Sequence, residues 1–84
     1  MSPVDAADDV DLDAISPMAW RLLRTAAGYE QREVERNVDD IMQAHVSMLE
    51  NETRSLSRAR LAKLYELYAA ELPGGQIDAI VDNF

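Results

Sequence analysis

Apolar residues recur along the chain at helical spacing, and no stretch shows the strict alternation of a half-buried β-strand. The clearest stripe lies in the second half and repeats at intervals of three, four and seven residues: Leu61, Leu64, Tyr65, Tyr68 and Leu72. Such spacing places these side chains on one face of an amphipathic helix. We therefore predict a long helix over about residues 55–72, ended by Pro73-Gly74-Gly75.

Capping residues predict a second helix over residues 17–27. Ser16 is a favoured N-cap residue, and Pro17 fits the first helical position because its missing N–H is not needed there. Gly28 is typical of the position just past a helix end. The apolar face of this helix is formed by Trp20, Leu23 and Ala27.

Three further segments are predicted to be short helices, each with its own apolar face. They are about Glu30 to Asn37 with Val34 and Val38, Ile41 or Met42 to Glu50 with Val46 and Leu49, and residues 76–84 with Ile77, Ile80, Val81 and Phe84. Asp39-Asp40 breaks the pattern between the first two, and residues 51–54 form a polar loop. Five short helices with tight loops predict an all-α fold.

Two of these apolar sets have more than one interpretation. The stripe of Ile77, Ile80, Val81 and Phe84 either closes the core or forms a symmetric dimer contact. The aromatic residues of the two longer helices are expected in the core and not on a stacking platform: Trp20, Tyr65 and Tyr68.

The charge is strongly uneven along the chain of 84 residues, which has a net charge of −8. Residues 1–16 carry five Asp and no base, residues 66–84 carry four acids and no base, and residues 17–65 hold all eight bases against seven acids. A net negative charge argues against nucleic acid as a partner, but gathering the bases in the middle weakens that objection. Seven of the eight bases are Arg, which fits either a salt-rich cytoplasm, where screening is strong, or an ordinary acidic protein.

Residues 1–15 are predicted to be a flexible acidic N-terminal lead, and residues 16–84 the folded domain, since 84 residues suffice for one domain. Val10, Leu12 and Ile15 are the residues through which the end of the lead can dock on the body.

Several function classes find no support in the residues. There is no cysteine and one histidine, no nucleophile–base pair, no Gly-rich phosphate loop and no calcium-loop spacing, so we expect no enzyme, metal or cofactor. No apolar stretch approaches the roughly 20 residues of a membrane span. The N-terminus also lacks the basic start and apolar core of a secretory signal, and we expect a cytoplasmic protein.

The middle of the chain carries an ordered set of residues. Arg24-x-x-x-Gly28-x-x-Gln31-x-x-Val34 is followed by Gln43-x-x-Val46-Ser47-x-Leu49-Glu50-Asn51, and then by Arg54, Leu56 and Leu61-x-x-Leu64. This set resembles the phage repressor/Cro-type (XRE-like) helix-turn-helix family over about residues 17–70. The resemblance implies a lambda-repressor-like bundle and a sequence-specific, DNA-binding transcriptional regulator that acts as a homodimer on double-stranded DNA.

The resemblance also implies residue roles. Arg24 would pair with Glu50, and residues 42–50 would be the recognition helix in the major groove. Its outward side chains would read bases: Gln43, Ala44, Ser47 and Met48. Phosphate contacts would come from Gln31, Arg32, Asn51 and Arg54. Gln contacts adenine, Ala the thymine methyl group, and Ser either kind of partner.

The chain departs from the family pattern in two places. The turn Asp39-Asp40-Ile41 is one residue longer than usual, and Glu52-Thr53 stand where Gly and Lys are frequent. Acidic residues near a phosphate backbone are unfavourable, which keeps a second hypothesis open: a helix-turn-helix module that binds a protein partner and not DNA. His45 is either a contact residue or a half-buried one, and Met42 and Met48 are either packing residues or exposed contacts.

Overall fold

Side-chain and glycine caps set the helix boundaries in the computed structural model, which describes residues 11–84. The Ser16 hydroxyl accepts a hydrogen bond from the Ala19 N–H at 3.0 Å, and Gly28 takes a left-handed φ of 89°. The Ser57 hydroxyl caps the fourth helix in the same way. The elements are a 3₁₀ turn η2 (Leu12–Ala14) and the helices α1 (Pro17–Ala27), α2 (Gln31–Asn37), α3 (Gln43–Glu50), α4 (Arg58–Ala69) and α5 (Gly74–Asn83).

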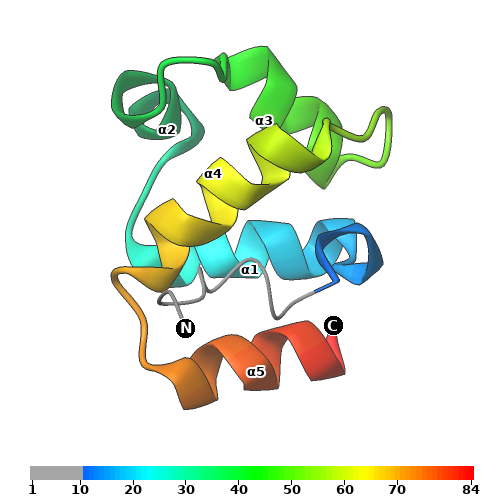
Figure 1. Cartoon of the computed structure of the whole chain (residues 1–84), viewed down its shortest axis with the longest axis vertical. Helices are drawn as coiled ribbons and strands as arrows, with labels where there is room; N and C mark the ends of the chain where they lie inside the picture. Colours follow the sequence, from blue (N-terminus) through cyan, green and yellow to red (C-terminus); the bar gives the residue numbers. More distant parts are fainter. Residues whose placement is uncertain (1–10) are drawn as a thin grey trace, which may run out of the picture.

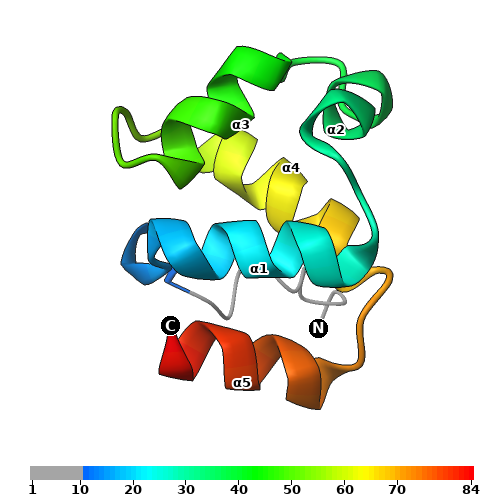
Figure 2. The same ribbon diagram turned by 180° about the vertical axis from the view of Figure 1, so that it is seen from behind.

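The all-α fold with five helices is confirmed, and residues 11–84 contain no strand. Figures 1 and 2 show α1 and α4 crossing in the middle of the bundle. α2 and α3 lie together at one end, and α5 lies on the opposite side of α1. None of these helices combines the length and the hydropathy that a membrane-spanning helix requires.

The helix predicted over residues 55–72 is shorter than expected. It begins at Arg58, because Ser57 caps it, and it ends at Ala69. Gly74 and Gly75 do not separate two helices, as predicted, but form the first turn of α5. The Pro73 carbonyl accepts hydrogen bonds from the N–H groups of Gln76 and Ile77, so the helical bonding begins before the glycines. Glycine is tolerated there because its conformational cost is a property of helix interiors, and these two residues are the first two of α5.

The core forms where α1, α4 and η2 meet. Trp20 and Tyr68 are both 1% exposed, and their rings meet edge to face with centroids 6.4 Å apart. Leu12 is fully buried and Ile15 nearly so, which confirms that these two residues dock the N-terminal segment on the body. The rest of the predicted acidic lead, Val10 included, lies outside the described residues.

The apolar stripe of α5 faces the core. Ile77 is 6% exposed, and Ile80 and Val81 are half-buried against the core residues. For Ile77 the interpretation that the stripe closes the core is confirmed, because its side chain is covered by its own chain. Phe84, by contrast, is 61% exposed.

Candidate nucleic-acid interface

A buried ion pair joins the first three helices. The Arg24 guanidinium donates from Nε to Glu50 Oε2 at 2.8 Å and from Nη2 to Oε1 at 3.0 Å, and its Nη1 donates to the Tyr29 carbonyl. The two side chains are 11% and 4% exposed. Arg24 thus links the end of α1, the turn before α2 and the end of α3. The pairing of Arg24 with Glu50 predicted from sequence is confirmed. Its two parallel hydrogen bonds fix the relative orientation of the two side chains as well as their separation.

The electrostatics of this cluster favour the charged pair. The hydrogen bond that Arg24 donates to Glu50 raises the pKa of Arg24, and the opposing effect of burial is smaller. Burial raises the pKa of Tyr68, which lies against the pair, and the Glu50 charge raises it further. The raised pKa values therefore favour the charged form of the Arg24 guanidinium and the neutral form of the Tyr68 phenol.

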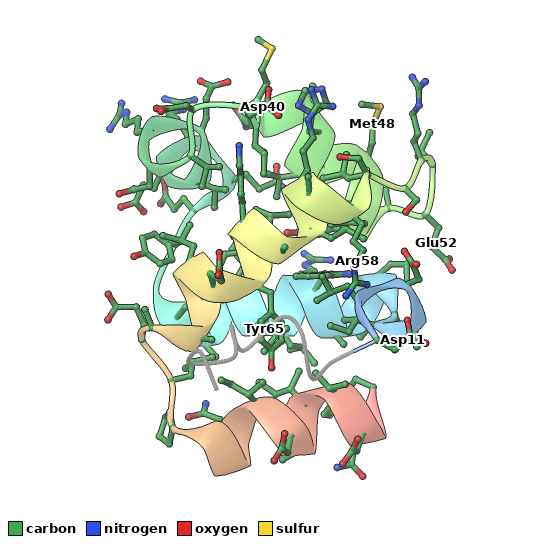
Figure 3. The ribbon with its side chains drawn as sticks, viewed as in Figure 1. Asp11, Asp40, Met48, Glu52, Arg58 and Tyr65 are labelled. Atoms are coloured by element: carbon green, nitrogen blue, oxygen red, sulfur yellow. The ribbon has the colours of Figure 1, made fainter. Side chains whose placement is uncertain are left out.

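α3 turns one face inward and one outward. Val46 is fully buried and Leu49 is 6% exposed, as the spacing predicted. The four candidate base-reading side chains lie on the other side: Gln43 and Ala44 are exposed, and Ser47 and Met48 are half-buried. Figure 3 shows Met48 pointing out of the end of the molecule formed by α2 and α3.

The start of α3 is held by two side chains that the sequence did not single out for this role. Glu35 Oε1 on α2 accepts from the Gln43 N–H at 2.9 Å, and His45 Nδ1 accepts from the Met42 N–H at 3.0 Å. An acceptor at a helix N-terminus satisfies an N–H group that has no partner within the helix. His45 is half-buried and contributes a cap. The three-residue spacing of Met42 and His45 is typical of such a cap, so the sequence carried a signal for His45. Glu35 is eight residues from Gln43, and no local pattern indicates that contact.

The candidate phosphate contacts differ in their surroundings. The half-buried Gln31 joins the ion-pair cluster, because its Nε2 donates to Glu50 Oε1 at 3.2 Å. Asn51 is exposed and donates to the Ser47 hydroxyl at 3.2 Å. Arg32 and Arg54 are exposed and form no ion pair within residues 11–84.

The turn between α2 and α3 is anchored at both ends. Val38 and Ile41 are 8% and 1% exposed, and the Ile41 N–H donates to the Val38 carbonyl. Asp39 and Asp40 stay at the surface. Two apolar side chains therefore hold this turn on the core, while its two acidic residues stay at the surface.

Asp40 is bound by cations of α4. Arg60 Nε donates to its Oδ2 at 3.2 Å, and Lys63 Nζ lies 4.0 Å away. The Arg60 hydrogen bond, with the charges of Arg60 and Lys63, lowers the pKa of Asp40. Part of the negative charge that the turn would present to a phosphate backbone is thus neutralised within the chain.

Residues 11–84 bring together no group of three or more His, Asp or Glu side chains that could hold a metal ion. They also leave no buried side-chain polar atom without a hydrogen-bond partner.

The comparisons with known proteins give a family but no characterised relative. No curated protein and no solved structure matches the chain. The family described as "Domain of unknown function (DUF8599)" matches residues 9–61, which run from just before η2 into α4 and make up more than half of the chain. The protein therefore belongs to the DUF8599 family.

Proposed function

We propose that this protein binds double-stranded DNA sequence-specifically through α3, as a transcriptional regulator, with two copies on one operator. The observation that carries the proposal is the uncharged outer face of a helix whose orientation is set by a buried ion pair. Glu50 is the only charged residue of α3, and Arg24 neutralises it inside the bundle.

The exposed side chains of α3 match the chemistry of the major groove. The Gln43 amide, which makes no hydrogen bond within residues 11–84, suits the bidentate contact to adenine. Ala44 suits a thymine methyl group, Ser47 either a donor or an acceptor, and Met48 an apolar contact. In helix-turn-helix docking, the N-terminal part of the recognition helix approaches the bases. Gln43 and Ala44 are the first two residues of α3, the proposed recognition helix.

Phosphate contacts are assigned to Arg32, Asn51 and Arg54, all of which are exposed near the ends of α2 and α3. Gln31 receives a different role from the one first expected. Because its amide donates to Glu50, we assign it to positioning α2 against α3.

Selection from a pool of random duplex DNA tests the proposal, repeated from low to molar KCl. Enrichment of one palindromic motif is the expected result, since two copies would read two half-sites about one helical turn apart. No enrichment at any salt concentration, from protein shown by circular dichroism to be folded, would overturn the proposal and favour a protein partner.

The variant Gln43→Ala then tests the reading of bases. It should weaken binding to the selected motif by about 1–3 kcal/mol and binding to random DNA very little. Gln76→Ala is the matched control, because Gln76 is an exposed glutamine in the first turn of α5, on the other side of α1. An equal loss on both kinds of DNA would show that Gln43 reads no base.

A further inference from the structure

A pocket of about 300 Å³ opens between α3, the segment after it and the start of α4. Its polar lining consists of hydrogen-bond donors and cations: His45, Arg54, Ser55, Ser57 and Arg60. The remaining lining residues are Met48 and Leu56, so no carboxylate lines it. On a chain with a net charge of −8, such a cluster of cations without acids is an unusual local environment.

Most of these donors keep hydrogens available. Arg60 uses Nε for Asp40, which leaves both of its terminal nitrogens. His45 Nδ1 accepts from the Met42 N–H, so the ring proton is on Nε2, a donor. The Ser57 oxygen accepts from the Arg60 N–H, which leaves its hydroxyl hydrogen. Arg54 donates no side-chain hydrogen bond within residues 11–84.

We propose that this pocket binds a phosphate group through Arg54, Arg60, His45 and Ser57. Guanidinium groups match the geometry of phosphate oxygens and bind them bidentately. Asp40, which binds the Nε of Arg60, is not part of the lining, and Lys63 Nζ also lies 4.0 Å from its carboxylate.

The phosphate has two sources that share this chemistry, a free phosphate ion and a phosphodiester of the DNA backbone. Met48 belongs both to the pocket lining and to the candidate base-reading face of α3. A phosphodiester bound here would therefore lie beside the bases that α3 reads, and this source rests on the proposed function.

The first experiment titrates the folded full-length protein with inorganic phosphate and follows backbone amide resonances by NMR, with chloride at equal ionic strength as the reference. Saturable shifts confined to residues around Ser57 and His45 are expected. Arg54→Gln and Arg60→Gln should each weaken the binding of phosphate about tenfold.

Arg58→Gln is the matched control, because it removes the same charge from the same helix without touching the pocket. Arg58 is exposed and is not part of the lining. In Figure 3 it lies at the level of η2, away from Met48. Circular dichroism and thermal unfolding show that each variant folds, and the Arg54 variant, in a loop, has the smallest effect on packing.

The second experiment measures DNA affinity against salt for the same variants. Arg54→Gln and Arg60→Gln should each reduce the salt slope of log K by about one, with Arg58→Gln unchanged. This result, with or without binding of free phosphate, supports a phosphodiester in the pocket. Saturable binding of phosphate by a protein that binds no DNA supports the pocket with a free ion and refutes the proposed function alone. The proposal is overturned if phosphate gives no more shift than chloride and the three variants share one salt slope or bind no DNA. It is also overturned if free phosphate binds equally well to all three variants and their salt slopes do not differ.

Discussion

α3 and α5 are both short helices that pack against α1, but different interactions hold them. α3 is fixed by two buried apolar residues, by the bidentate Arg24–Glu50 pair and by acceptors at its N-terminus from Glu35 and His45. α5 is held by one buried residue, Ile77, and by a hydrogen bond of 2.7 Å that the Ser16 hydroxyl donates to the Phe84 carbonyl.

The outer faces of the two helices also differ. α3 exposes uncharged polar and apolar side chains, whereas α5 exposes Asp78 and Asp82 with no base on the same helix. Apolar contacts are not directional, while charge-assisted hydrogen bonds define one geometry. The comparison indicates that the chain sets the orientation of α3 with directional interactions and uses α5 to cover α1. The family match, residues 9–61, contains α3 and not α5.

Breaking the ion pair should have the largest effect. Arg24→Ala leaves the Glu50 carboxylate charged and buried, so the free energy of unfolding should fall by about 3–5 kcal/mol. Urea unfolding followed by circular dichroism measures the loss. Asp40→Asn, which breaks the exposed pair with Arg60, is the comparison and should change stability far less. A similar loss of stability for both variants would mean that the buried Arg24–Glu50 pair stabilises the fold no more than an exposed ion pair does.

Loosening α5 should have a smaller effect. Ile77→Ala should lower the free energy of unfolding by about 2 kcal/mol, at the low end for such changes because an edge helix can partly close the space. Phe84→Ala, at an exposed position, should change it by less than about 0.5 kcal/mol. If Ile77→Ala lowered DNA affinity at temperatures where the variant is fully folded, α5 would have more than a covering role.

Raising the pH should give the smallest change in the free energy of unfolding per pH unit, and it tests the ionisation of Tyr68. Burial raises its folded-state pKa above the unfolded value of about 10, so the folded state favours the neutral phenol. The stabilisation is complete below pH of about 10 and is lost above it, by at most about 1.4 kcal/mol per pH unit for this residue.

Tyr68→Phe should remove the part of the stability loss above pH of about 10 that comes from Tyr68. A smaller loss should remain in this variant, because the pKa values of Tyr65 and Tyr29 are also raised. Urea unfolding at pH 9, 10 and 11 provides the measurement. Equal slopes for the variant and the original protein would show that Tyr68 does not ionise in this transition.

Local signals in the sequence predicted the elements well where caps and periodicity agree. α1 has the predicted bounds, because Ser16, Pro17 and Gly28 act through the backbone next to them. The glycines at the start of α5 misled the prediction, since Gly74 and Gly75 are typical of both loops and helix termini. The inward positions of Val46 and Leu49 followed from spacing alone.

The sequence by itself determined the helical class, the apolar faces and, through the family resemblance, the Arg24–Glu50 pair. Only the tertiary structure showed that Gln31 joins that pair, that Glu35 caps α3 and that α5 covers the core with Ile77. It alone brought Arg60 beside His45 to line one pocket. The physical reason is range: caps and periodicity act between neighbours along the chain, whereas these contacts depend on how helices distant in sequence pack.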